Sequence, residues 1–296
     1  MKNFALTASW LYVLRSRRVA HRVLRRFDLA GKNGRELPHL RPTRESTASS
    51  HWKTAPMMTA FFFLESSYVA PDAWYLYDPA QGGEAGVSKK TALAKTSPVD
   101  FSDIEAAREF AISQDGTKVP VNILRRKGTK LDGHHPTLLT AYGGYGISLR
   151  PAFHYTDRIW FDRGGIMAVA NIRGGGEYGE EWHIGGNLTR KQNVFDDFAA
   201  CARHLVERGY TQPARLAVEG GSNGGLLMGA FLTQHPDLAR AVVSHVGIYD
   251  MLRVELDPNG RRARSQWRLQ CHRVRHGERS RAVPGALCLL AVSSRR

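Results

Sequence analysis

The sequence predicts an α/β fold between about residues 110 and 250, preceded by a smaller all-β part. Three observations support this. Short apolar runs alternate with segments of helical periodicity, which is typical of a mostly parallel sheet covered by helices. Two of these runs end in glycine-rich loops, and another leads into a serine flanked by glycines. Aromatic-rich runs at 60–80 have instead the length and turn signals of short antiparallel strands.

The expected elements follow one another in a regular order along the chain. Asp115-Gly116 between two strand-like runs is a hairpin signal, and Phe198, Ala202 and Leu205 share one face of a helix. The expected elements are two strands within 60–80, a hairpin of 108–113 and 119–125, strands at 137–141 and 166–172, a helix at 196–207, a strand at 216–218, a helix at 226–234 and a strand at 241–246.

The most informative segment is 216–230, LAVEGGSNGGLLMGA. An apolar strand runs into Gly220, Ser222 and Gly224, and good helix formers follow. Strand, sharp turn and helix, with glycine two residues before and after a serine, form the pattern of a nucleophile elbow. Small neighbours let strand and helix approach, so that the hydroxyl projects above the sheet. The order of elements therefore indicates an α/β-hydrolase core; the alternative is a glycine-rich turn in which Ser222 only caps the helix.

Three motifs then make the chain similar to a known family. The segments AYGGYG (141–146), ANIRGGGEYGEEWHIGGNLTRKQNVFDDF (170–198) and GGSNGGLLMGA (220–230) resemble the prolyl oligopeptidase family of serine peptidases. The resemblance covers roughly residues 60–259 and implies cleavage of short peptides after proline by a hydrolase domain that follows a β-propeller. Tyr-Gly-Gly and the Asn after the serine favour prolyl oligopeptidase proper. Alternatives are an oligopeptidase B-like or carboxylesterase-like hydrolase, or a non-catalytic fragment with basic tails.

The resemblance also implies roles for single residues. Ser222 would be the nucleophile, and the Tyr142 hydroxyl and the Asn223 backbone N–H would be the two oxyanion donors. Such donors are worth about 3–4 kcal/mol each at most in a dry site. Tyr145 and Ile248 would line the pocket for the proline ring. The alternatives are packing at the strand end for Tyr142, and ordinary core packing for Tyr145 and Ile248.

Two pairs of charged residues near these loops are expected to be structural. Arg173 and Glu177 are expected to form an ion pair that positions the glycine-rich loop. Asp196 and Asp197 are expected to head the following helix, where carboxylates interact favourably with the helix dipole.

The sequence lacks partners for the serine. A serine nucleophile needs a base and an acid that orients it, and in this fold the acid and then the histidine follow the serine. The 74 residues after Ser222 contain neither the acid loop nor the histidine loop that the resemblance implies. Asp250 and Asp257 come too soon after Ser222. His235 lies at the end of an expected helix and His245 at the end of an expected core strand. His272 and His276 lie in an Arg-rich tail. We therefore expect an incomplete triad and an inactive chain.

The positive charge is concentrated at the two ends of the chain. Residues 1–53 hold 12 Lys or Arg and 3 Asp or Glu, and residues 261–296 hold 10 Arg and one Glu, whereas 54–260 hold 20 basic and 23 acidic residues. A nucleic-acid-binding face would lie within the folded domain, so no specific nucleic-acid binding is expected. The lysine-free, unpatterned segment from 261 is typical of coding DNA translated out of frame, which indicates a frameshift near codon 260; a genuine basic interaction tail is the alternative.

The sequence thus divides into three expected parts. These are a β-propeller remnant at 1–105, the N-terminal part of the hydrolase domain at 106–259, and an aberrant, unstructured tail at 260–296. The three cysteines have neither zinc spacing nor an even disulfide framework, so no metal or cofactor is expected. No apolar run approaches a membrane span, and the N-terminus lacks the order of a signal peptide. We therefore expect a cytoplasmic protein whose partners are small proline-containing peptides, with no membrane partner.

Overall fold

The computed structural model describes residues 60–78, 81 and 87–250, and, before residue 60, Lys32 and the backbone of five strands. The chain forms two compact units. Of the described residues, the first unit holds those up to 107 and 150–162, and the second holds 108–149 and 163–250. The sequence did not predict that 150–162 join the first unit. No helix among the described residues is long and apolar enough to cross a bilayer.

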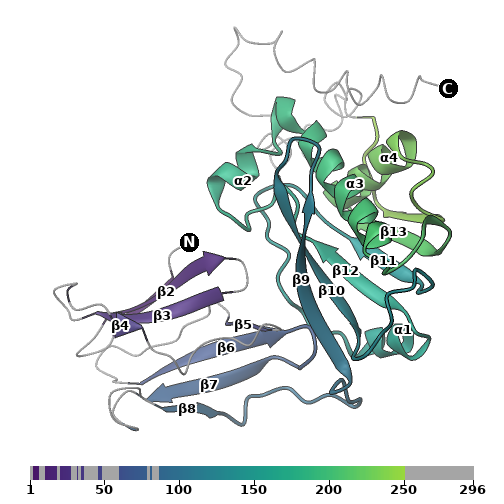
Figure 1. Cartoon of the computed structure of the whole chain (residues 1–296). Helices are drawn as coiled ribbons and strands as arrows, with labels where there is room; N and C mark the ends of the chain where they lie inside the picture. Colours follow the sequence, from purple (N-terminus) through teal and green to yellow (C-terminus); the bar gives the residue numbers. More distant parts are fainter. Residues whose placement is uncertain are drawn as a thin grey trace, which may run out of the picture. The chain divides into compact units, whose positions relative to one another are not determined.

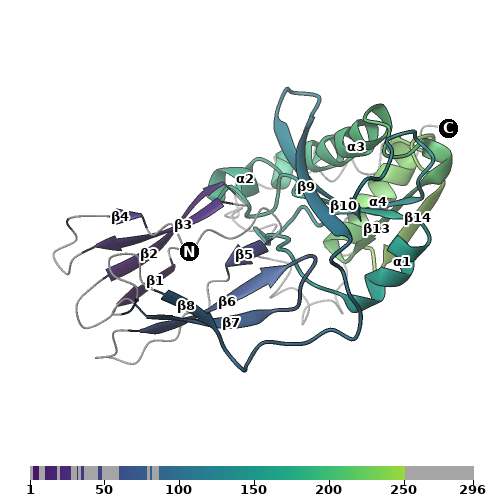
Figure 2. The same ribbon diagram turned by 60° about the horizontal axis from the view of Figure 1, so that its bottom comes forward.

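The first unit contains two four-stranded antiparallel sheets (Figures 1 and 2). Phe61 and Tyr77 pair across β6 and β7, are fully buried, and place their ring centroids 4.9 Å apart. Aromatic cross-strand pairs of this kind stabilise sheets, and they confirm the two aromatic strands predicted within 60–80. That these sheets are propeller blades stays a prediction. The elements of this unit are β1 (Asn3–Leu6), β2 (Leu11–Arg18), β3 (His21–Phe27), β4 (Arg35–Glu36), β5 (Ser46–Ala48), β6 (Phe61–Ser67), β7 (Ala73–Asp78), β8 (Val87–Lys90), η3 (Tyr155–Asp157) and α1 (Arg158–Asp162).

The second unit is built on a six-stranded mixed sheet of order β14-β13-β11-β12-β10-β9. The pairs β11–β12, β11–β13 and β13–β14 are parallel, and β10–β12 is antiparallel. This is the predicted incomplete α/β-hydrolase sheet. Its elements are β9 (Ile104–Ile112, which starts in the first unit), β10 (Lys118–Arg126), β11 (Thr137–Thr140), β12 (Ile166–Ala170), α2 (Glu180–Ile184), η4 (Leu188–Arg190), α3 (Gln192–Glu207), η5 (Pro213–Arg215), β13 (Leu216–Gly221), α4 (Asn223–Gln234) and β14 (Ala241–His245).

The core of the second unit lies between the sheet and the helices α3 and α4, which run next to each other (Figure 1). Phe198 of α3 and Phe231 of α4 meet edge-to-face with centroids 5.3 Å apart. They belong to the same buried cluster as Leu139 and Val218 of the central strands β11 and β13. The apolar face predicted for the helix at 196–207 is therefore confirmed, although α3 starts four residues earlier, at Gln192.

The last described strand differs from its expectation. The sequence indicated a core strand at 241–246, but β14 lies at the edge of the sheet and pairs only with β13 among the described strands. Val243 is 42% exposed and Val246 is 83% exposed. A run of valines predicts a strand, but the sequence alone does not show whether a neighbouring element covers it.

Candidate active site

Ser222 lies alone in the turn between β13, which ends at Gly221, and α4, which begins at Asn223. Its φ of 56° and ψ of −116° are unfavourable for a residue with a side chain. The turn is tight enough that a Cβ on Gly220 would collide with the backbone of Gly224, and one on Gly224 would lie 2.8 Å from the carbonyl oxygen of Ala141. Glycine is therefore required on both sides of the serine, as the elbow pattern predicted.

The Ser222 side chain is not used to hold the helix. Its backbone N–H donates to the carbonyl of His245 at 2.8 Å, and its carbonyl accepts from Leu226 N–H at 3.0 Å. Its hydroxyl makes no capping hydrogen bond, and has no partner in the part of the chain that the structure describes. The alternative that Ser222 only caps the helix is wrong. The structure leaves this half-buried hydroxyl available for chemistry.

Asn223 joins the elbow to the Tyr-Gly-Gly loop. Its buried side chain donates from Nδ2 to the carbonyl of Tyr142 at 2.5 Å. Its Oδ1 accepts from Lys191 Nζ at 2.9 Å, and Nζ also donates to the carbonyl of Gly143 at 3.0 Å. A Cβ on Gly144 would lie 2.6 Å from the Asn223 side-chain amide. The glycine therefore leaves the space that the amide fills.

Lys191 was not singled out from the sequence. It stands between η4 and α3 in a run of polar residues, Thr-Arg-Lys-Gln-Asn, where an ordinary solvent-exposed lysine is expected. Burial around its ammonium lowers its pKa to about 8, although part of the side chain reaches the surface. No signal in the sequence separates it from the neighbouring Arg190.

The remaining predicted site residues are placed only in part. The Tyr142 ring lies 6.5 Å from the Tyr145 ring between centroids, and the Tyr142 hydroxyl has no hydrogen-bond partner among the described residues. Tyr145 has a positive φ of 57°, which turns the loop back after Gly144. Ile248 is half-buried beyond the end of β14. Convergence of the Tyr142 hydroxyl on Ser222, and a proline pocket at Tyr145 and Ile248, stay predictions.

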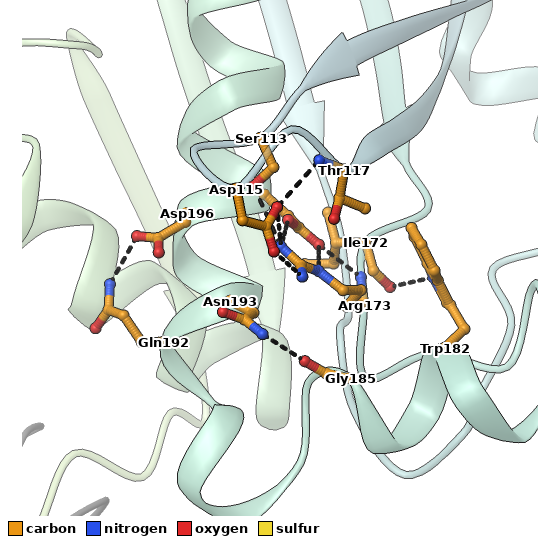
Figure 3. A network of polar contacts seen from close by, with 11 residues as sticks. Ser113, Asp115, Thr117, Ile172, Arg173, Trp182, Gly185, Gln192, Asn193 and Asp196 are labelled. Atoms are coloured by element: carbon orange, nitrogen blue, oxygen red, sulfur yellow. Dashed lines mark hydrogen bonds and ion pairs between the residues drawn. The ribbon is translucent and has the colours of Figure 1, made fainter.

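The charged loop beside the site is built differently from the prediction (Figure 3). Arg173 donates from Nε and Nη2 to the two oxygens of Asp197 at 2.9 and 2.6 Å, and from Nη1 to Asp115 at 2.5 Å. Asp197 is fully buried and also accepts from the Arg173 backbone N–H. The hydrogen bond from Arg173 lowers the pKa of Asp115 to about 2. The predicted Arg173–Glu177 ion pair is therefore wrong.

Glu177 instead forms hydrogen bonds with Leu149 and Asn171. Its Oε1 accepts from the backbone N–H of Leu149 at 2.9 Å and from Asn171 Nδ2 at 3.2 Å. Its Oε2 is buried without a hydrogen-bond partner among the described residues, and burial raises the pKa of the carboxyl to about 7.

The helix-dipole role predicted for Asp196 and Asp197 is also wrong. Because α3 begins at Gln192, neither carboxylate lies in its first turn. Asp196 accepts from Gln192 Nε2 at 2.8 Å, and Asp197 serves the buried Arg173.

No histidine among the described residues is hydrogen-bonded to the Ser222 hydroxyl. His235 follows the end of α4, and the largely exposed His245 ring lies 3.2 Å from Glu219. Three further candidates, Asp257, His272 and His276, lie outside the described residues.

Comparisons with known proteins agree with this site. A model described as "Prolyl oligopeptidase family" matches residues 151–272, so the match extends into the Arg-rich segment that starts at 261. The chain is 43% identical over 192 residues to the prolyl endopeptidase of Elizabethkingia meningoseptica, which covers 65% of the chain and 26% of the relative. The chain therefore spans about a quarter of the length of this curated relative.

Solved structures show the same likeness. A prolyl endopeptidase structure superposes with a TM-score of 0.75 at 38% identity, covering 87% of this chain and 37% of that one. Oligopeptidase B from Trypanosoma brucei superposes with a TM-score of 0.73 at 32% identity, covering 86% of this chain and 36% of that one. With the elbow at Ser222, these matches show that the chain is similar to the prolyl oligopeptidase family of serine peptidases, whose model matches it over residues 151–272.

Proposed function

We propose that this chain carries the nucleophile and the oxyanion donors of a peptidase that cleaves short peptides on the carboxyl side of proline. The observation that carries the proposal is Ser222, held in an unfavourable backbone conformation with an uncommitted hydroxyl beside the N–H of Asn223. Strained residues of this kind cluster at active sites. The proline preference is supported by the relatives named prolyl endopeptidase.

The proposed reaction is acyl transfer. The Ser222 oxygen attacks the carbonyl carbon of the peptide bond after proline, and its proton passes to a general base and then to the leaving amine. The developing oxyanion accepts hydrogen bonds from the Asn223 backbone N–H and the Tyr142 hydroxyl. Water then hydrolyses the ester on Ser222 and releases the peptide ending in proline. Tyr145 and Ile248 contact the proline ring.

The 296-residue chain is proposed to be inactive by itself. The sequence after Ser222 lacks recognisable acid and histidine loops, and no described histidine is hydrogen-bonded to the serine hydroxyl. A serine whose partner histidine is removed loses on the order of 10⁶ in turnover. A cytoplasmic location is also part of the proposal.

A second candidate is an oligopeptidase B-like enzyme, because a solved oligopeptidase B superposes almost as well as the prolyl endopeptidase. The test compares two chromogenic peptides, one with proline and one with arginine before the scissile bond. They are offered to a protein whose reading frame is restored after residue 259, with Ser222→Ala as the control. We expect hydrolysis of the prolyl peptide, abolished by Ser222→Ala. Preference for the arginyl peptide would favour the second candidate, and hydrolysis that survives Ser222→Ala would contradict both.

A further inference from the structure

The Tyr-Gly-Gly loop and the elbow are joined by a closed set of hydrogen bonds that passes through Lys191. The Asn223 side chain donates to the Tyr142 carbonyl and accepts from Lys191, and Lys191 donates to the Gly143 carbonyl. These contacts join three segments that are 32 to 81 residues apart in the chain. Both hydrogen-bonding ends of the Asn223 amide are thereby used.

We propose that Lys191 is a positioning residue of the oxyanion site, which fixes the Tyr142–Gly143 backbone relative to Asn223. The inference rests on the proposed function, in which Tyr142 and Asn223 supply the two donors to the oxyanion. A pair of donors stabilises a developing charge only if both are held in place before the reaction. Lys191 contacts the backbone next to one donor and the side chain of the other.

The chemistry of this lysine argues against a purely stabilising role. Its two described partners, the Gly143 carbonyl and Asn223 Oδ1, are neutral. Burial is the one cause that lowers its pKa, to about 8, so no charged side chain among the described residues sets this value. A buried ammonium that faces only neutral acceptors is unfavourable for folding. Lys191 contacts Asn223, the residue next to the proposed nucleophile. Groups with perturbed pKa values cluster at functional sites of this kind.

Close packing makes the connection specific to this place. The Asn223 amide fills the space above Gly144, where a Cβ would lie 2.6 Å from it. Gly143 has a φ of 63°, and a Cβ there would lie 2.5 Å from the Val194 side chain at the start of α3. The loop, the elbow and the beginning of α3 therefore meet at one point, and Lys191 supplies the polar contact among them.

The test uses the full 296-residue chain and Lys191→Met, which keeps the length of the side chain but removes its donors and charge. Lys118→Met, at an exposed lysine of the same unit, is the matched control. Lysine and asparagine side-chain NMR signals are followed from pH 6 to pH 10, and Asn223→Ala assigns the Asn223 amide. We expect one lysine with a midpoint near pH 8, and an Asn223 amide that shifts with the same midpoint. In Lys191→Met the lysine signal is lost and the Asn223 amide no longer shifts with this midpoint, whereas both are kept in Lys118→Met. An Asn223 amide whose chemical shifts are the same in the unaltered chain and in Lys191→Met over the whole pH range would overturn the inference.

A second readout separates positioning from stability. N-Acetyl-glycyl-proline, a product-like carboxylate, is titrated while the backbone N–H of Asn223 is observed. We expect its Kd to rise tenfold or more in Lys191→Met and to stay unchanged in Lys118→Met; an equal Kd in the unaltered chain and Lys191→Met would overturn the positioning role. If the unaltered chain shows no shift at all, the proposed function is contradicted, and the pH titration alone decides the inference.

Discussion

Replacing Ser222 by glycine should stabilise the chain relative to replacing it by alanine. Both changes remove the hydroxyl, which has no hydrogen-bond partner among the described residues, so that loss cancels. They differ in the backbone, because φ is 56° and ψ is −116°. A residue with a Cβ in such a region costs about 1–3 kcal/mol, whereas glycine adopts it without this penalty. The greater conformational freedom of glycine in the unfolded state lowers this advantage by about 0.4–1 kcal/mol. The expected net difference is about 1 kcal/mol in favour of glycine.

The assay is urea unfolding of Ser222→Gly and Ser222→Ala, followed by far-ultraviolet circular dichroism. A control pair at Arg203, an exposed residue in the interior of α3, should show the opposite order, because alanine is favoured over glycine in the middle of a helix by about 0.5–1 kcal/mol. Ser222→Gly that is no more stable than Ser222→Ala would refute the strained elbow. The proposed nucleophile would then lie in an ordinary loop.

Two further predictions concern the charged residues near the site. Asp197→Ala leaves Arg173 buried without its main partner and should lower the free energy of unfolding by about 3–5 kcal/mol; Asp115→Ala, at a carboxylate that is 47% exposed, should cost about 1 kcal/mol or less. Equal losses in urea unfolding would contradict this assignment. Because the folded pKa of Glu177 is raised to about 7 from an ordinary value near 4.3, the folded state binds more protons between these pH values. Stability relative to Glu177→Gln should therefore fall as pH rises from about 4 to 8, by about 3 kcal/mol in total; a difference that does not change with pH would contradict the burial of this carboxyl.

The elbow and the sheet could be predicted because their determinants are local. Gly220, Ser222 and Gly224 lie within five residues of one another, and the turn that needs them is made by the same segment. The strand at 166–170 is a continuous apolar run between glycine and asparagine, and the strand at 137–140 holds two leucines between threonines. Such patterns depend on the period and length of a segment more than on its partners.

The partners of charged residues could not be predicted, because they are set by the tertiary fold. Arg173 lies four residues from Glu177 in sequence, yet it pairs with Asp197 and with Asp115, which is 58 residues away. In the sequence, Lys191 resembles a surface lysine. In the fold, its position between η4 and α3 places its ammonium 2.9 Å from Asn223 Oδ1. The predicted start of α3 is too late: Val194 and Phe195 are apolar and buried in its first turn, but they follow a polar run that resembles a loop. The predicted dipole role of Asp196 and Asp197 is wrong for the same reason.

Labelling of Ser222 tests the central claim most directly. A fluorophosphonate probe is applied to the 296-residue chain, to the protein with the reading frame restored after residue 259, and to Ser222→Ala in both, and the labelled peptide is identified by mass spectrometry. The account predicts no labelling of the 296-residue chain, and labelling at Ser222 in the restored protein only. Rapid labelling of the 296-residue chain that Ser222→Ala abolishes would show that a residue of this chain serves as the base. Absence of labelling at Ser222 in a folded, restored protein would contradict its role as the nucleophile.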